Sequence, residues 1–431
     1  MKNKFKSYKE CIPYLFNLER AGIKYDLINI KLLLSFLDNP QTEFKSIHIA
    51  GTNGKGSVSS ILNSFLMEKG FKTGLYTSPH LRDFRERISV SGRLISREFI
   101  LEFINKIYNE IEKIKPSFFE VTTAMAFEYF KRRKVEYAVI ETGLGGRLDS
   151  TNVLKPVLSV ITSLSIDHIE FLGNRIEKIT YEKGGIIKKN IPVVIGNVSE
   201  VSKQILKKTA KKNKSEIIFS SDRNKLKIIS RSEKGFCFDL NNKSSNLYFP
   251  MIGDYQVSNI KTFLSAADVL KKYENLDYDE DDLRRSFKNI KINSNIAGRF
   301  EMISDNPILI LDVSHNVQAI QNIKKNLSYF KFEKLIIIFA MMKDKNYEEC
   351  LSELCKFRAK IILTKPEYKR SAEPSELLKA VKRNRSRFIV KNDLKGAVKE
   401  AREISGRKDL ILITGSFFLA GDYLSLPDSF K

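Results

Sequence analysis

The chain has 431 residues, of which 42% are hydrophobic, and this length predicts about two or three domains with well-filled cores. Lysines and arginines number 74 against 51 acidic residues, which gives a formal net charge of +23. No apolar run approaches the roughly 18 residues of a membrane-spanning helix, and the four scattered cysteines form no C-x-x-C pair. Composition therefore argues against a membrane protein, a disulfide framework and a cysteine-bound zinc site.

The basic N-terminus is followed by an apolar stretch too short and too broken for a signal peptide, so we expect a cytoplasmic protein with reduced thiols. The charge is compatible with nucleic-acid binding, with attraction of small polyanionic substrates, or with a lysine-rich surface that has no specific partner. Lysines are spread along the whole chain and alternate with acids, which favours the third interpretation. The basic run at 203–214 is typical of an exposed helix face, and no cluster of aromatic residues and arginines for stacking bases stands out.

The first half of the chain alternates between helical and strand patterns. Helices are expected twice within 7–38, from Val58 onward, at 96–113 with Ser96 as cap, and at 118–131. Strands are expected at 47–50, 137–141, 157–162 and 191–195, and a further strand is expected to end at 75–80. The strand at 191–195 follows a helix that holds Lys183. Strands that alternate with helices in this way predict a parallel α/β sheet.

The second half begins with a change of character. Four short apolar runs predict a β insertion at the edge of the sheet, at 217–219, 226–229, 237–240 and 247–249. A helix is expected at 256–272, and the polar stretch 289–298 is interpreted as a linker. Five further strands alternate with helices, at 308–311, 334–339, 359–363, 387–390 and 410–413. We therefore expect an α/β fold with two doubly wound domains, residues 1–295 and residues 296–431.

A glycine-rich turn at 51–57, with the sequence GTNGKGS, connects the first strand to a helix. Its glycines let backbone N–H groups close around an anion, and the helix N-terminus adds partial positive charge, so this arrangement favours phosphate binding. Lys55 would reach the terminal phosphates, and Ser57 would place a hydroxyl on a magnesium ion. The general pattern G-x-x-x-x-G-K-[ST] is met imperfectly, because Ile49 and Gly56 stand at its first and last positions. A tight connection without a ligand is the alternative.

Polar residues stand at the carboxyl ends of several predicted strands. Thr77-Ser78, Glu141 and Asp167-His168 each follow an apolar run, as the glycine turn does, and ligands of parallel sheets bind beyond these ends. Glu141 is a natural magnesium ligand. Each of these residues also has an alternative interpretation without a ligand. Glu141 is then a strand-end acid in a salt bridge, His168 a structural histidine and Lys183 an ordinary surface lysine.

Motifs distributed along the chain carry a resemblance to a known family. They are GTNGKGS at 51–57, TSPH at 77–80, FEVTT at 119–123, ETGLGGRLDSTN at 141–152, D-H-x-x-F-L-G at 167–173, EKGGI at 182–186, GRFE at 298–301, DVSHN at 312–316 and GSF at 415–417. On these motifs the chain resembles, over essentially its whole length, folylpolyglutamate synthases and dihydrofolate synthases, members of the Mur ligase superfamily. The shortened glycine turn is the form that this family uses.

The resemblance implies a larger N-terminal P-loop ATPase domain that carries the β insertion, and a smaller C-terminal Rossmann-like domain that binds glutamate. The implied reaction is an ATP-dependent ligation of L-glutamate to a carboxylate of dihydropteroate, of a reduced folate (poly)glutamate, or of both, through an acyl phosphate, in folate biosynthesis and retention. The implied cofactors are ATP and Mg²⁺ at two sites, with K⁺ as a further candidate. The expected partners are small-molecule substrates of a monomer, with no nucleic acid and no membrane.

The resemblance also assigns roles to single residues. Contacts to ATP are implied for Thr52, Asn53, Gly54, Lys55, Gly56, Ser57, Asn259, Arg299 and Asp312. Metal ligands are implied at Ser57, Ser78, Glu141, His168 and Lys183, with Lys183 as a carbamate. That modification turns a cation into an anion, and a lysine pKa lowered by burial or by nearby cations would favour it. Catalytic roles are implied for Lys183, His168 and Glu141, and glutamate binding for His315 and Ser416.

Some positions depart from the family pattern. Val313 stands where relatives often have glycine, Gly184 stands where alanine is common, and the chain has no tryptophan. None of these departures removes a polar group that the chemistry needs. The alternatives are a cell-wall Mur ligase, for which the 50 residues before Gly51 are too few, a P-loop ATPase acting on nucleic acid, and an inactive relative. The sequence leaves open whether the enzyme makes dihydrofolate, extends the glutamate chain or does both.

Overall fold

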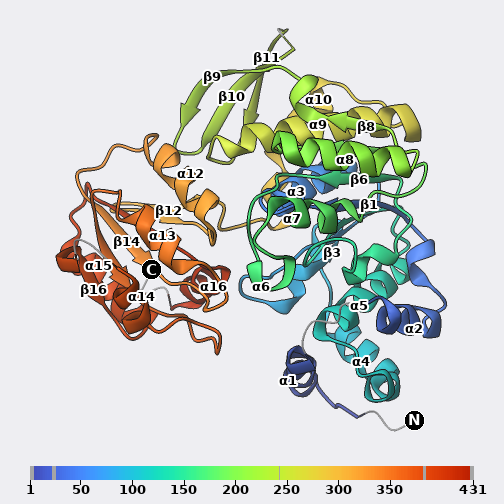
Figure 1. Cartoon of the computed structure of the whole chain (residues 1–431), viewed down its shortest axis with the longest axis horizontal. Coiled ribbons are helices and arrows are strands. Elements are labelled where there is room, and N and C mark those ends of the chain that lie inside the picture. The colour runs from blue at the N-terminus through green and yellow to red at the C-terminus, as the bar shows by residue number, and fades with distance from the viewer. Residues whose placement is uncertain (1–3, 22–25, 242, 382–384, 428–431) are drawn as a thin grey trace.

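Figure 1 shows the computed structural model of the chain, which describes residues 4–21, 26–241, 243–381 and 385–427. An N-terminal α/β unit, coloured blue to yellow, lies beside a C-terminal α/β unit in orange and red, and a small β sheet projects from the first (Figure 1). Within the described ranges, no helix is both long and apolar enough to cross a membrane.

The N-terminal unit is built on an eight-stranded sheet with the order β4-β3-β2-β5-β1-β6-β7-β8. The strands are β1 Lys45–Ala50, β2 Thr73–Tyr76, β3 Ile88–Val90, β4 Arg93–Leu94, β5 Tyr137–Glu141, β6 Leu158–Ile161, β7 Val193–Ile195 and β8 Ile217–Phe219. In this spatial order, the neighbouring pairs β2-β5, β5-β1, β1-β6, β6-β7 and β7-β8 are all parallel. The short β3 and β4 add an antiparallel edge next to β2, which the sequence patterns did not predict.

Helices cover both faces of this sheet. They are α1 Tyr8–Asn17, α2 Ile28–Phe36, α3 Lys55–Glu68, α4 Arg97–Ile114, α5 Phe118–Arg132, α6 Ile169–Leu172, α7 Ile176–Gly184, α8 Glu200–Lys212 and α9 Tyr255–Glu274. Successive side chains of β5 point to opposite faces, so Ala138 and Ile140 join the core under α4 and α5, whereas Val139 joins the core under α3 and α9. As expected, the Ser96 hydroxyl caps α4 by accepting the N–H of Phe99.

The β insertion is a separate antiparallel sheet of three strands, β9 Leu226–Ser232, β10 Gly235–Leu240 and β11 Lys243–Phe249. Phe238 and Phe249 pack against Phe287 of α10 (Glu280–Lys288). The run at 217–219, expected in this insertion, is instead β8, which pairs in parallel with β7 in the main sheet. Three apolar residues carry no periodicity that could separate the edge of one sheet from the start of another.

The expected linker at 289–298 is partly helical. Ile290–Ser294 forms α11, which packs on α3. The Asn293 side-chain N–H donates to the Ser64 hydroxyl at 3.0 Å, and its carbonyl accepts from the Asn63 side chain at 2.8 Å. Ile290 also joins the core, but Ile292 is exposed, so the five residues of α11 show no apolar periodicity that would predict a helix.

The C-terminal unit has a six-stranded sheet with the order β12-β13-β17-β14-β15-β16. The strands are β12 Glu301–Asp305, β13 Ile308–Leu311, β14 Leu335–Phe339, β15 Ala359–Leu363, β16 Phe388–Val390 and β17 Leu410–Thr414. The helices are α12 Val317–Leu327, α13 Tyr347–Leu354, α14 Pro374–Ala380, α15 Leu394–Ile404 and α16 Phe417–Ser425. Five strands agree with expectation, and the antiparallel, partly exposed β12 was missed. The prediction of two doubly wound α/β units with a small β insertion is confirmed.

Candidate active site

The glycine turn joins β1 to α3 and is packed closely from outside. Gly54, at φ 88°, precedes α3, and a Cβ at this position would lie 2.4 Å from the Asn259 side-chain oxygen. A Cβ at Gly56 would lie 3.0 Å from Nη2 of Arg299. Asn259 comes from α9, and Arg299 lies two residues before β12, at the start of the C-terminal unit. The glycine at 56, which broke the general P-loop pattern, makes room for this arginine.

The turn is anchored to the loop that follows β6. The Thr52 N–H donates to the Ser163 carbonyl at 2.7 Å, and the Asn53 carbonyl accepts from the hydroxyls of Thr162 at 2.8 Å and Ser163 at 3.0 Å. These bonds fix the backbone before any ligand arrives, so the N–H groups at the start of α3 are preorganised.

Glu141 and Lys55 meet beneath the turn. The Glu141 side chain is buried, and its Oε1 lies 3.8 Å from Nζ of Lys55, which also donates to the Thr52 carbonyl at 3.4 Å. Burial raises the pKa of Glu141, against the opposing effects of Lys55, Arg299 and the Ser78 backbone N–H. Ser57 is buried in the first turn of α3. Glu141 is thus both a strand-end acid in a loose ion pair and a carboxylate available beside the phosphate turn.

Lys183 is not a surface residue. α7 directs it into the sheet edge, where Nζ donates to the Gly51 carbonyl at 2.9 Å and 5% of the residue is exposed. Burial first, and then the nearby Lys55 cation, lower the pKa of Lys183 to about 7. A substantial fraction of the amine is therefore neutral near physiological pH, which is the form that reacts with carbon dioxide.

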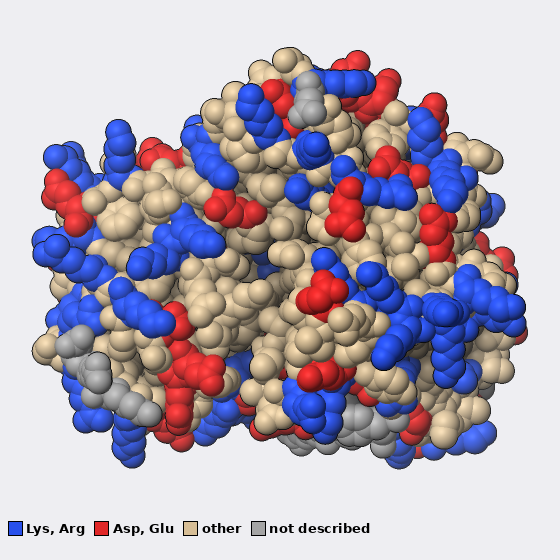
Figure 2. All heavy atoms as spheres, turned by 45° about the horizontal axis from the view of Figure 1, so that its top comes forward, with Lys and Arg blue, Asp and Glu red and all other residues tan. Residues whose placement is uncertain are grey.

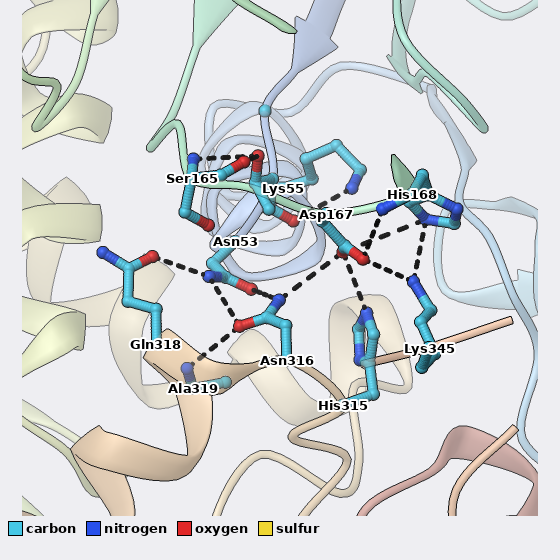
Figure 3. Close-up of polar contacts among 12 residues, drawn as sticks. Asn53, Lys55, Ser165, Asp167, His168, His315, Asn316, Gln318, Ala319 and Lys345 are labelled. Carbon is cyan, nitrogen blue, oxygen red and sulfur yellow. Dashed lines mark hydrogen bonds and ion pairs between the residues drawn. The ribbon is translucent and has the colours of Figure 1, made fainter. Parts of the chain in front are cut away.

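Asp167 is the centre of a network between the two units (Figure 3). Its Oδ1 accepts from Lys345 Nζ at 2.6 Å, and its Oδ2 lies 3.5 Å from both His315 Nε2 and Asn316 Nδ2. Burial would raise the pKa of Asp167, but His315, His168 and Lys345 hold it well below its usual range. Three side chains of the C-terminal unit therefore converge on one carboxylate of the N-terminal unit.

His168 lies beside this carboxylate in a left-handed backbone conformation, at φ 51°. Burial lowers its pKa to about 3, so its imidazole is neutral, as a metal ligand must be. Its Nε2 is 3.2 Å from Lys345 Nζ (Figure 3). The ammonium group thus stands where a metal ion on Nε2 would stand, and metal binding at this nitrogen requires Lys345 to move.

A second cross-unit contact involves Asn53 of the glycine turn. Its side-chain oxygen accepts from Asn316 at 3.0 Å, and its N–H donates to Gln318 at 2.9 Å (Figure 3). Asn316 also caps α12 by accepting the Ala319 N–H at 3.0 Å. The residue expected to contact ATP therefore holds the start of a helix from the other unit.

Arg299 and Asp312, the other expected nucleotide contacts, lie at the start of the C-terminal unit. The Arg299 guanidinium lies 4.9 Å from the Phe417 ring centroid. Asp312 is buried and accepts the N–H groups of Phe300 and Ser314, each at 3.0 Å, and burial raises its pKa. Its carboxylate already shapes the turn that presents His315.

The two residues expected to bind the substrate glutamate, His315 and Ser416, have different hydrogen-bond partners within the protein. His315 Nδ1 is hydrogen-bonded to the Val313 carbonyl at 3.0 Å, which directs Nε2 to Asp167. Ser416 is buried and caps α16 by accepting the Phe418 N–H at 3.0 Å, so its hydroxyl has a structural partner. Val313, which departs from the family pattern, packs against Gly298. A Cβ built on Gly298 would lie 3.0 Å from Cγ1 of Val313.

The donor set fits a metal that is shared with substrate phosphates. Among the described residues, no group of three or more His, Cys, Asp or Glu side chains is placed to enclose an ion. Magnesium commonly takes one or two carboxylates and completes its coordination with phosphate and water. Glu141 and the Ser57 hydroxyl beside the phosphate turn meet that requirement.

The sequence analysis assigned no role to Lys345, Asn316 or Gln318. It placed Asp167 beside His168 beyond a strand end, at the edge where ligands bind, but gave it no role of its own. Lys345 is one lysine in a lysine-rich chain and gives no local signal. Asn316 lies one residue from His315 in the motif at 312–316, which was the available clue.

Family comparisons agree with this geometry. Residues 49–267 match the Mur ligase middle domain and residues 298–417 match the Mur ligase glutamate ligase domain, so the fold is that of a Mur-type, ATP-dependent ligase. The dihydrofolate synthase/folylpolyglutamate synthase of Bacillus subtilis is 31% identical over 97% of this chain and 98% of its own length. The chain belongs to the folylpolyglutamate synthase/dihydrofolate synthase family.

Solved structures agree as well. Mycobacterium tuberculosis folylpolyglutamate synthase, complexed with ADP and AMPPCP, superposes with a TM-score of 0.86 at 27% identity, over 97% of this chain and 98% of that one. A bifunctional folylpolyglutamate synthase/dihydrofolate synthase with Mn, AMPPNP and L-glutamate bound gives a TM-score of 0.84 at 26% identity, over 97% and 98%.

Proposed function

We propose that this enzyme uses ATP to join L-glutamate to a carboxylate of dihydropteroate, of a reduced folate, or of both. The observation that carries the proposal is the position of Arg299 against Gly56, at a turn where Glu141 also approaches Gly56 and lies 3.8 Å from Lys55. A phosphate on the turn would meet cations from both units. The relatives are named for this activity, and one of their structures holds AMPPNP, Mn and L-glutamate.

The chemistry follows from the weakness of a carboxylate as an electrophile. A carboxylate oxygen of the acceptor attacks the γ-phosphorus of ATP, the bond to the bridging oxygen breaks, and ADP leaves. The amine of glutamate then attacks the acyl carbon, phosphate departs with its oxygen, and the amine loses a proton. Backbone N–H groups of the turn, Lys55 and Arg299 neutralise the transferred phosphoryl group, so the protein's contribution is positioning and charge.

Magnesium would be held by Glu141 and Ser57 at the phosphates, where it supplies further charge neutralisation. A second ion would take Ser78, His168 and a carbamylated Lys183. Support for the carbamate comes from the burial of this lysine and from the lowered pKa of its amine, to about 7. The hydrogen bond of Lys345 to His168 must be released first. K⁺ remains a further candidate ion.

The remaining parts of the proposal concern glutamate, domains and assembly. His315 and Ser416 would contact glutamate in a C-terminal domain of residues 296–431, with residues 1–295 as the ATP-binding domain. Support comes from the two sheets and from the separate family matches at 49–267 and 298–417. A cytoplasmic monomer without nucleic-acid or membrane partners completes the proposal, and size-exclusion chromatography tests the oligomeric state.

The test presents each acceptor separately to the purified enzyme with ATP, Mg²⁺ and radiolabelled glutamate. Label in the product with dihydropteroate indicates dihydrofolate synthesis, label with a tetrahydrofolate indicates chain extension, and label with both indicates a bifunctional enzyme. Matched release of ADP is expected in each productive case. No incorporation with either acceptor would contradict the ligase function.

A further inference from the structure

Arg87 is a buried cation that the proposed chemistry does not use. It ends the short helix η3 (Phe84–Arg87) just before β3, and 8% of the residue is exposed. Its Nε donates to His80 Nδ1 at 2.8 Å, and its guanidinium lies 5.1 Å from the Phe118 ring centroid. Among the described residues, no carboxylate forms an ion pair with it and no acceptor takes a hydrogen bond from Nη1 or Nη2.

A buried guanidinium without a carboxylate partner is costly, because it loses water without gaining an opposite charge. Burial lowers the pKa of Arg87, and the carboxylates that oppose this effect, Glu19 and Glu141, act only at longer range. Arg85, two residues earlier in the same helix, makes the ordinary arrangement by pairing with Asp83 at 2.7 Å. The contrast indicates that Arg87 is kept for an anion that is not part of the chain.

The surroundings of Arg87 are aromatic. Phe16 of α1 stacks on Phe118 with ring centroids 5.5 Å apart and lies 6.0 Å from His80. Phe84 lies 6.0 Å from Phe118 and 6.3 Å from His80. These four rings, Phe16, His80, Phe84 and Phe118, are the aromatic cluster around Arg87. An apolar wall beside one fixed cation suits an acid that also has a flat ring system.

This aromatic cluster adjoins the phosphate site. The Arg87 carbonyl accepts the Thr77 N–H at 3.0 Å, and the next residue, Ser78, donates its N–H to Glu141. The C-terminal unit also reaches this region: Tyr368 donates to Glu19 at 3.1 Å and stacks on Phe418 at 3.9 Å. A ligand on Arg87 would therefore lie beside the phosphate site, where both units meet.

We propose that Arg87 binds a carboxylate of the acceptor substrate while the aromatic cluster contacts the acceptor's rings. The inference rests on the proposed function, since it needs an acceptor that is both an acid and aromatic. The Nε of Arg87 is hydrogen-bonded to His80, and its guanidinium lies against the ring of Phe118. Nη1 and Nη2 of Arg87 are therefore available to bind a carboxylate. The carboxylate belongs either to the pteroyl group or to an added glutamate, and the two acceptors distinguish these sources.

The kinetic test compares Arg87→Gln and Arg87→Lys with Arg85→Gln as matched control. Arg87→Gln should raise KM for the acceptor by roughly ten- to a hundredfold, the effect of losing a charge-assisted hydrogen bond. KM for ATP and for glutamate should stay within about twofold. Arg87→Lys should recover only part, because an ammonium lacks the planar fork. If Arg87→Gln raises KM for dihydropteroate, Arg87 binds the pteroyl carboxylate. If it raises KM only for glutamylated acceptors, Arg87 binds a carboxylate of the glutamate tail. An unchanged KM for both acceptors overturns the inference.

A thermal-shift test with acceptor alone separates binding from structure. Dihydropteroate or tetrahydrofolate should raise the unfolding temperature of the wild type and of Arg85→Gln, but not of Arg87→Gln. Without acceptor, Arg87→Gln should unfold no earlier than the wild type, because it loses an unpaired buried charge. Earlier unfolding of ligand-free Arg87→Gln with a retained acceptor shift assigns a structural role and overturns the inference. A wild type that binds acceptor but incorporates no glutamate refutes only the proposed function.

Discussion

His48 illustrates at the residue scale what burial does to a titratable group. It lies in the middle of β1 with no exposed surface, and Nε2 is 2.8 Å from the Thr151 hydroxyl. Because that hydroxyl donates to Asp149 at 2.5 Å, Nε2 must be the donor to Thr151, and Nδ1 has no partner among the described residues. Burial lowers the pKa of His48 to about 3.

This histidine should make the protein sensitive to mild acid. The unfolded chain binds a proton on His48 with a pKa near 6.5, whereas the folded protein binds it only near pH 3, so stability falls as the pH drops between these values. The loss at pH 5 is about 2 kcal/mol. The free energy of unfolding is measured by denaturant titration at pH 7.5 and at pH 5. Its decrease between these pH values should be about 2 kcal/mol smaller in His48→Asn than in the wild type. Equal losses in both proteins would contradict the assigned pKa.

Lys183 carries the prediction that separates a carbamate from a plain cation. Lys183→Ala should lower kcat by about a hundredfold or more, since loss of even an outer partner of a metal costs roughly ten- to a hundredfold. Added short carboxylates should restore part of the activity, because they return an anion to the vacated space. Lys188→Ala is the matched control, since Lys188 is also partly buried and donates to the Asn152 carbonyl. Full activity of Lys183→Ala without additives would exclude the carbamate role.

At the scale of elements, the start of α3 shows how a local exception serves the site. Gly56 would carry a Cβ 3.0 Å from Arg299 Nη2 and 3.7 Å from Glu141 Oε2. Gly56→Ala should therefore displace Arg299 and raise KM for ATP by about tenfold, the effect of weakening one charged contact. The unfolding temperature should hold or rise, because alanine favours helix. Gly396→Ala in α15, where a Cβ meets only ordinary contacts, is the control. An unchanged KM for ATP would show that Arg299 does not act at the phosphates.

Strong periodicity and burial are what made elements predictable. The strands β1, β5, β14 and β17 are apolar runs buried along most of their length, and α4 has a capping serine, so each was found from the sequence. The elements missed or misassigned have weaker signals. β12 is partly exposed, β8 has three residues, and the five-residue α11 buries only Ile290 and Asn293. Tertiary context, rather than local pattern, decides such elements.

The candidate site divides in the same way. Positions at or beyond the ends of buried strands, such as Glu141 and His168, were predictable because parallel strands end at one edge. Lys345 was not, because its role depends on how the C-terminal unit sits against Asp167. Nor was the use of Ser416 as a helix cap, which competes with its expected contact to glutamate.

At the scale of the whole molecule, the charge of +23 is dispersed rather than concentrated. Figure 2 shows lysines and arginines across the visible face, with acidic residues between them. The few cations that meet buried partners have more specific roles. Lys345 has 10% of its side chain exposed and joins the two units through Asp167, whereas Lys343, two residues earlier, is 53% exposed and pairs with Glu376 inside its own unit.

This difference predicts how the two units respond to loss of one charge. Lys345→Met leaves Asp167 buried without its closest partner, and breaking a buried pair in this way costs about 3–5 kcal/mol. Only the arrangement with the units in contact carries this cost, because separation returns Asp167 to water. The ligand-free variant should therefore show a larger radius of gyration by small-angle X-ray scattering.

The kinetic consequence should follow from the same shift in population. If the closed arrangement is needed to bring His315 and Arg299 to the phosphate turn, Lys345→Met should lower kcat by about tenfold or more, as expected when closure completes a site. Lys343→Met should match the wild type in both scattering and kcat. Its charge is lost equally, so any general effect of net charge would appear in both variants. An unchanged radius of gyration in Lys345→Met would show that the network around Asp167 does not hold the units together.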